Sequence, residues 1–281
     1  MNKPCIVMQT DFGKGVSTCT MEGVIAQLDP EIRVYDSTHD ITPFDTYEAS
    51  YDLFYVVAFW PRGTIFVSVV DPGVGTSRRA CVAKLKNGCY VVTPDNGTLS
   101  HMVKYIGVEE VREIDEVRNR YPSTLACSIF HGRDLFAYCA GKFASGLISY
   151  EEVGPRYPVE EIVIHSTVEA LAKEGMATGM LETADRHFGL ICSNISQKAF
   201  AAAGFSYGDR VRTVIRHDKE IVYQEVIPFV KSFGFVQKGQ VLIMVSETLE
   251  MQIARSYGNI YEEYHFGTGP DWTISFTKES L

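Results

Sequence analysis

Residues 64–79 read TIFVSVVDPGVGTSRR, a run of β-branched and apolar residues that ends at Asp71 and passes into a glycine-rich turn. Such a continuous apolar run, bounded by turn residues, is typical of a buried strand. Residues 5–10 (CIVMQT) have the same form and end at Asp11. Repeated units of this kind, separated by helix-like segments, predict a mostly parallel sheet covered on both faces.

The segments between and after these strands continue the pattern. Asp45 and Glu48 form a capping-box pattern that opens a helix ending near Trp60-Pro61. Further elements are predicted as a helix face through Met21, Val24, Ile25 and Leu28, strands at 32–36, 80–85, 89–93 and 125–130, and helices at about 98–105 and 133–145, the last stopping at Gly146.

After about residue 165, short strand-like runs alternate with glycine-containing turns, which indicates a small antiparallel β-barrel or sandwich. The sequence therefore predicts an α/β protein. We expect an N-terminal domain over 1–165, with a mostly parallel sheet flanked by helices, and a smaller antiparallel β domain over 175–281.

Composition narrows the classes of function. Lys and Arg number 26 against 35 Asp and Glu, a net charge of −9 that argues against a nucleic-acid surface. The longest apolar runs are far shorter than the ~20 residues of a membrane span, and the N-terminal segment does not resemble a secretory signal. Seven cysteines without a CxxC pair favour free thiols in a reducing cytoplasm.

An acid or a histidine follows most of the predicted strands, and ligands bind outside the carboxyl ends of parallel strands. Each residue taken alone is equally typical of a turn or a helix cap. The glycines of the DPGVG segment suit either a close backbone approach to a ligand or a tight turn, and no Walker or GxGxxG pattern completes a phosphate site. The strand-end residues are Asp11, Asp36, Asp71, Asp95 and His131.

Five motifs occur in order: TDFG (10–13), DSTHDITPFD (36–45), VVDPGVGTSRR (69–79), TPDNG (93–97) and FHGRDLFA (130–137). Together they resemble the S-adenosylmethionine hydroxide adenosyltransferases, relatives of the fluorinase and chlorinase. The resemblance covers the whole chain and is looser after residue 180. It implies attack of water on the ribose C5′ carbon of S-adenosylmethionine, giving adenosine and L-methionine without a metal or separate cofactor. It also implies a homotrimer with the substrate between the N-domain of one subunit and the C-domain of its neighbour.

The resemblance assigns site residues by motif position. The catalytic triad falls on Asp71, Arg78 and His131. The substrate-binding positions fall on Asp11 for the ribose hydroxyls, Phe44 near the ribose, Asp185 and Phe188 in the C-domain, and Ser246 and Arg255 toward the methionine end.

Two departures from the family pattern lie in the C-domain. Leu190 replaces the usual Asn after Phe188-Gly189, and the 246–250 loop carries Glu247 and Glu250 where a substrate carboxylate is expected. Both leave recognition of adenine and methionine open.

Several alternatives remain at this stage. Halogenases carry Tyr at the position of Asp71, and a carboxylate there repels halide, so water is the favoured nucleophile. Whether His131 deprotonates the water or only orients it stays open. The rival functions are a module that binds adenosine or S-adenosylmethionine without turnover, and a metal-dependent hydrolase whose candidate ligands are Asp11, Asp36, His39, Asp40 and Asp95.

Overall fold

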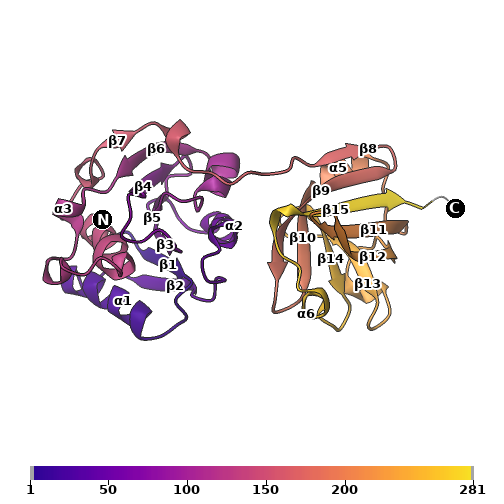
Figure 1. Cartoon of the computed structure of the whole chain (residues 1–281), viewed down its shortest axis with the longest axis horizontal. Coiled ribbons are helices and arrows are strands. Elements are labelled where there is room, and N and C mark those ends of the chain that lie inside the picture. The colour runs from indigo at the N-terminus through magenta and orange to yellow at the C-terminus, as the bar shows by residue number, and fades with distance from the viewer. Residues whose placement is uncertain (1–2, 280–281) are drawn as a thin grey trace. The chain divides into compact units, whose positions relative to one another are not determined.

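The computed structural model describes residues 3–279, which divide into two compact units with the boundary between His165 and Ser166 (Figure 1). Residues 1, 2, 280 and 281, the outer ends of the two predicted domains, lie outside the described residues. Within the described range the fold is α/β, with a mixed sheet in the first unit and an antiparallel sheet in the second. The predicted fold class is confirmed.

The first unit is built on a seven-stranded sheet, counted within residues 3–165, in the order β2-β1-β3-β5-β4-β6-β7. The strands β2, β1, β3 and β5 are parallel to one another, whereas β4, β6 and β7 run antiparallel to their neighbours. The strands are β1 Ile6–Thr10, β2 Val34–Thr38, β3 Ile65–Val69, β4 Ala80–Leu85, β5 Tyr90–Pro94, β6 Val108–Glu113 and β7 Arg156–Tyr157.

Helices cover both faces of this sheet, because every residue of β1 and β3 is buried and each face needs apolar cover. Ile6 and Met8 pack under α1 and α4, and Val7 packs on the opposite face under α2. The helical elements are α1 Val16–Leu28, α2 Thr46–Val57, η1 Met102–Ile106, α3 Glu116–Asn119, η2 Pro122–Thr124, η3 Gly132–Ala137, α4 Tyr138–Ser145, η4 Glu151–Val153 and η5 Val159–Glu161.

Local sequence signals explain several helix ends. The Asp45 carboxylate accepts hydrogen bonds from the backbone N–H groups of Tyr47 and Glu48 and so begins α2. In a capping box, the Glu48 carboxylate would accept the N–H of Asp45. Here it accepts the N–H of Thr42, three residues earlier in the chain. At the other end of the unit, Gly146 adopts a left-handed conformation, φ 77°, and ends α4 as predicted.

The predicted strand at 125–130 is wrong. This segment follows the 3-10 turn η2 and forms turns and bends. Leu125 and Ile129 are exposed, so the apolar run is not a sheet core. Arg120 donates to the backbone carbonyl of Cys127, and Cys127 N–H donates to Thr124. His131 therefore begins a helix, the π-helical turn η3 that continues into α4, and does not follow a strand.

The second unit contains an eight-stranded sheet, counted within residues 166–279, in the order β12-β11-β15-β9-β10-β14-β13, with β8 paired to β9. A bridge between Phe229 and Ile243 joins the two ends of this order, so the sheet is nearly closed, as in a barrel. Its elements are β8 Leu171–Lys173, β9 Met176–Asp185, β10 Leu190–Ser196, α5 Gln197–Ala202, β11 Arg210–His217, β12 Glu220–Pro228, η6 Phe233–Phe235, β13 Val241–Val245, β14 Glu250–Arg255, α6 Ile260–Tyr264 and β15 Gly269–Lys278.

Among the described residues, no helix is long and apolar enough to cross a bilayer. All seven cysteines are free thiols.

Candidate active site

A cavity of about 290 Å³ opens in the first unit at the carboxyl ends of β1 and β3. Four of the residues singled out in the sequence line it: Asp11, Phe44, Asp71 and His131. The remaining lining residues are mostly apolar: Phe12, Pro43, Val69, Val74, Ile129, Phe130 and Gly132. Parallel strands bring Asp11 and Asp71 to one sheet edge, as the strand pattern predicts.

The DPGVG segment forms a tight turn. Val74 N–H donates to the Asp71 carbonyl at 3.2 Å, and Thr76 donates to the Gly73 carbonyl from both its N–H and its hydroxyl. Gly75 has φ +74°, and a Cβ there would lie 2.9 Å from the Ser128 carbonyl oxygen. Gly75 therefore permits the chain reversal that returns Arg78 to the side chain of Asp71.

The TPDNG segment stabilises the same turn through hydrogen bonds to its backbone. Asn96 Nδ2 donates to the Val70 carbonyl at 2.8 Å, immediately before Asp71. Asp95 N–H donates to the Arg79 carbonyl at 2.8 Å, immediately after Arg78. The Asp95 carboxylate accepts from Tyr157 and from the Val163 N–H, which leaves it inside a buried network rather than in the cavity.

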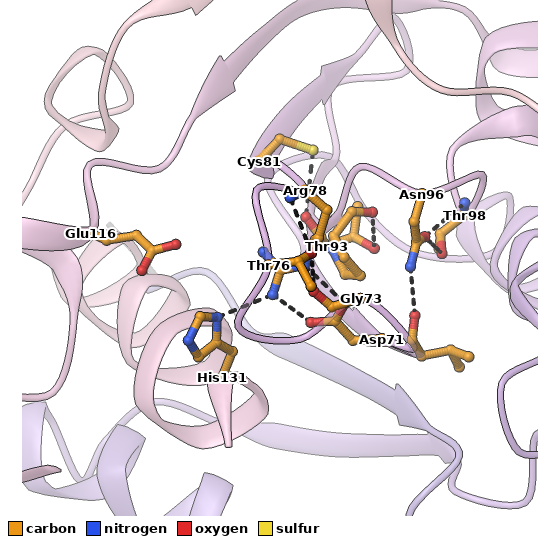
Figure 2. Close-up of polar contacts among 12 residues, drawn as sticks. Asp71, Gly73, Thr76, Arg78, Cys81, Thr93, Asn96, Thr98, Glu116 and His131 are labelled. Atoms are coloured by element: carbon orange, nitrogen blue, oxygen red, sulfur yellow. Dashed lines mark hydrogen bonds and ion pairs between the residues drawn. The ribbon is translucent and has the colours of Figure 1, made fainter. Parts of the chain in front are cut away.

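Arg78 lies between Asp71 and His131 (Figure 2). Its Nε donates to Asp71 Oδ1 at 2.8 Å, and its Nη2 donates to Asp71 Oδ2, a bidentate pair. The same Nη2 lies 3.1 Å from Nδ1 of His131. The guanidinium carbon sits 5.2 Å from the centre of the Phe136 ring. These contacts fix both the carboxylate and the imidazole from a single buried cation.

The contact with Arg78 determines which nitrogen of His131 carries the proton. A guanidinium only donates hydrogen bonds, so Nδ1 must accept with its lone pair, and the neutral ring then holds its proton on Nε2. Burial lowers the pKa of His131, the positive charges of Arg78 and Arg120 lower it further, and Glu116 and Asp71 oppose them. Nε2 is buried and has no hydrogen-bond partner among residues 3–279. His131 is thus a neutral ring with one N–H to offer.

Asp11 and Phe44 are coupled to each other. Asp11 Oδ2 accepts the backbone N–H of Phe44 at 2.9 Å. Phe44 has φ +71°, in the left-handed region that is unusual for a bulky residue, and the residue is 71% exposed. An acid that lines the cavity therefore holds a residue with a strained backbone at the cavity's rim.

Two of the four site residues predicted in the second unit line a separate cavity of about 620 Å³: Phe188 and Arg255. Arg255 already donates to the Gly239 carbonyl and pairs with Glu263. Sequence reasoning did not single out the other residues of this cavity, whose aromatic members had no motif to mark them. Those residues are His187, Phe233, Gly234, Tyr257, Gly258, Asn259 and Glu262.

The remaining two predicted residues of this unit stabilise turns. Asp185 Oδ1 accepts from the N–H groups of His187 and Phe188, which sets the loop between β9 and β10. Ser246 is buried, and its hydroxyl bonds to Thr248 and accepts the Glu250 N–H. Asp185 therefore places Phe188 at the cavity, while Ser246 closes the hairpin between β13 and β14.

The alternative metal-ligand set is dispersed. Asp36 bonds to His39 and Lys14, and Asp95 bonds to Tyr157. Among residues 3–279 no group of three or more His, Cys, Asp and Glu side chains is arranged to hold a metal ion. The first cavity is lined by the Asp71 carboxylate that Arg78 fixes, by the His131 ring and by a second carboxylate, Asp11.

The chain is similar over most of its length to proteins with two kinds of name. (R)-S-adenosyl-L-methionine hydrolases from Salinispora tropica and Methanocaldococcus jannaschii are 31% and 27% identical to it; the first alignment covers 91% of this chain and 91% of the relative, and the second covers 90% and 89%. A fluorinase from Actinopolyspora mzabensis is 24% identical, over 95% of this chain and 96% of the relative.

The fold is similar to that of an uncharacterized conserved protein from Thermotoga maritima, with a TM-score of 0.84 at 30% identity, covering 97% of this chain and 99% of that one. Family models match both units. The SAM hydroxide adenosyltransferase N-terminal domain matches residues 6–154, and the C-terminal domain of the same family matches residues 179–273. The chain therefore belongs to the SAM hydroxide adenosyltransferase family.

Proposed function

We propose that this protein hydrolyses S-adenosyl-L-methionine by attack of water on the ribose C5′ carbon, releasing adenosine and L-methionine. One observation carries the proposal. Asp71 and His131, both held by Arg78, line one cavity together with a second acid, Asp11, that suits a ribose diol. The hydrolase names of the relatives agree with this chemistry.

The reaction needs little catalysis of leaving-group departure by the protein. As the new C5′–O bond forms, the C5′–S bond breaks and its electron pair goes to sulfur, so the sulfonium leaves as the neutral thioether of methionine. No acid is needed for that step. The protein has to hold water about 3–3.5 Å behind C5′, in line with sulfur, and to receive the proton that the attacking oxygen loses.

Asp71 is the proton acceptor of this proposal. Each of its oxygens accepts from Arg78 and retains a further lone pair, so the carboxylate can orient a water proton and take it as the C–O bond forms. His131 acts differently. Its Nδ1 lone pair is directed at Arg78, so acting as a base through Nε2 would require a proton on Nδ1, where two donors would meet at 3.1 Å.

A halogenase reading is disfavoured by the same group. The Asp71 side chain is only 5% exposed, and an ionised carboxylate at that depth repels a halide that must also shed its water. Arg78 balances Asp71, but Asp71 remains the group of this pair that lines the cavity.

The finer features are part of the proposal. The second unit supplies the remaining substrate contacts through Phe188 and Arg255, while Asp185 positions Phe188 and Ser246 holds the hairpin between β13 and β14. The active assembly is a homotrimer in the cytoplasm, with sites formed between subunits. The exposure of Phe44 and of Ile129, 71% and 80%, supports this assembly, because both are large apolar side chains on the rim of the cavity.

The test is an assay of the purified protein with each sulfonium epimer of S-adenosylmethionine, with chromatography of the products. The expected result is adenosine and methionine, with isotope from labelled water in the 5′-hydroxyl, and an unchanged rate in excess EDTA. Sedimentation of the same sample should give three chains. Calorimetric binding without product would establish the binding module instead. Activity that EDTA abolishes would establish the metal hydrolase.

A further inference from the structure

A chain of hydrogen bonds runs behind the cavity, beginning at a residue that does not line it. His39 is 4% exposed and follows β2. Its Nε2 lies 3.0 Å from Asp36 Oδ1, and its Nδ1 lies 2.9 Å from the hydroxyl oxygen of Thr10, the last residue of β1. The Thr10 oxygen in turn accepts the N–H of Phe12 at 3.1 Å.

The direction of every bond in this chain follows from donor and acceptor capacity. The Asp36 carboxylate accepts, and Lys14 donates to its other oxygen at 2.7 Å, so the His39 proton is on Nε2. In the neutral ring Nδ1 is then an acceptor, and the Thr10 hydroxyl donates to it. With its proton committed, the Thr10 oxygen has a lone pair for the Phe12 N–H. Each group is satisfied in this arrangement, which orients the Thr10 hydroxyl uniquely.

The chain ends on the segment that carries Asp11. His39 holds that segment twice, through Thr10 to the Phe12 N–H and through its own carbonyl, which accepts the Gly13 N–H at 2.8 Å. Asp11 lies between Thr10 and Phe12, and both Asp11 and Phe12 line the cavity. The backbone on either side of Asp11 is thus fixed by polar contacts that a substrate does not touch.

We propose that His39 is a positioning residue for the substrate: through Thr10 it fixes the Asp11 carboxylate that binds the ribose hydroxyls. The inference rests on the proposed function for the identity of the ligand. Asp11 contacts a part of the substrate that does not react, so its position affects the ground state and the transition state alike. Loss of the chain should therefore raise KM and leave kcat nearly unchanged.

Substitutions at Thr10 separate this role from general packing. Thr10→Val keeps the side-chain shape and removes the hydroxyl, which leaves the buried His39 Nδ1 and the part-buried Phe12 N–H unpaired. Thr10→Ser keeps the hydroxyl and is the matched control. We expect Thr10→Val to weaken adenosine binding by roughly 10-fold, the size of one hydrogen bond to a charged group, and Thr10→Ser to bind within about twofold of the parent.

The two nitrogens of His39 are tested in the same way. In His39→Asn the amide oxygen occupies the place of Nδ1 and preserves the acceptor for Thr10, whereas in His39→Gln the amide reaches the place of Nε2 and preserves only the contact with Asp36. The proposal expects His39→Asn to bind adenosine more tightly than His39→Gln. The opposite order would mean that the Asp36 contact, and not the Thr10 contact, matters.

The deciding experiment is a double-mutant cycle on adenosine affinity, measured by calorimetry with Thr10→Val, Asp11→Asn and the double variant. If the chain acts through Asp11, Thr10→Val costs about 10-fold in the parent and almost nothing beside Asp11→Asn. Independent, multiplicative losses would overturn the proposal, as would a parent protein that does not bind adenosine. Because adenosine binding needs no turnover, a protein that binds adenosine with this coupling yet does not hydrolyse S-adenosylmethionine refutes the proposed function alone.

Discussion

Replacing His131 decides whether the imidazole is a base or a hydrogen-bond partner of Arg78. In His131→Asn the amide oxygen can take the position of Nδ1, 3.1 Å from Arg78 Nη2, and the ability to exchange a proton is lost. In His131→Ala the acceptor is lost as well. The two variants therefore remove the two candidate roles separately.

The expected sizes differ enough to measure. Arg78 has only 9% of its side chain exposed, so losing its partner leaves a buried donor unpaired at a cost of about 1–3 kcal/mol. At about 1.4 kcal/mol per tenfold, His131→Ala should lower kcat/KM by roughly 5- to 150-fold if the whole cost falls on the position of Asp71. His131→Asn should stay within about tenfold of the parent. Loss of a general base would instead cost both variants about 10²–10⁴-fold.

The assay is steady-state hydrolysis of S-adenosylmethionine across a range of pH, with adenosine quantified by chromatography. Asp71→Asn is the reference, because it removes the proposed acceptor and turns an amide N–H toward Arg78; we expect a fall of about 10²–10⁴-fold in kcat/KM. The acidic limb of the kcat/KM profile should persist in His131→Asn. A His131→Asn variant as impaired as Asp71→Asn, with its acidic limb gone, would refute the assignment of the proton to Asp71.

Three further outcomes follow from the described geometry. Burial lowers the pKa of His131 and of His165 below the usual 6.5, so between the lowered values and about 6.5 the unfolded chain binds more protons than the folded one. The free energy of unfolding should therefore rise with pH over that interval, and His131→Asn should make this rise smaller in urea titrations. Phe44→Gly relieves a left-handed φ, so it should raise the free energy of unfolding by about 1 kcal/mol while weakening adenosine binding. A lower free energy of unfolding would show that Phe44 is not strained. Gly75→Ala forces a Cβ toward the Ser128 carbonyl at a positive φ and should destabilise the protein by more than about 1 kcal/mol, whereas an unchanged melting temperature would contradict the turn as described.

Strands buried on both faces could be predicted from the sequence. Residues 6–10 and 65–69 are wholly buried, so their apolar runs directly report the environment. The run at 125–130 has a similar composition, but Leu125 and Ile129 are 57% and 80% exposed, and a pattern of residue types does not distinguish a core from a rim. The sequence also did not predict which strands pair, because the strand order depends on contacts between segments that are distant in the sequence.

In the candidate site, too, some residues could be placed from the sequence and others could not. Asp11 and Asp71 could be expected at one edge, because parallel strands end together and the acids follow them directly. His131 reaches the same cavity from the start of a helix, so the prediction that it follows a strand was wrong about the element that carries it, and the family motif indicated its role. Residue spacing does not encode side-chain directions. It therefore could not show that Ser246 hydrogen-bonds within a turn or that His39 pairs with Thr10.

The π-helical turn at Gly132–Ala137 restricts how this region can change length. Wide turns of this kind hold one residue more than the α-helix into which they continue. The wide turn accommodates that extra residue locally, so the helix on either side of it keeps its register. Loss or gain of a residue in the regular helix α4 would instead rotate everything before it by about 100° about the helix axis, the angle per residue of an α-helix. His131 would then lose its register with Arg78. Natural variation in length should accordingly collect in the exposed loop before His131 and avoid α4.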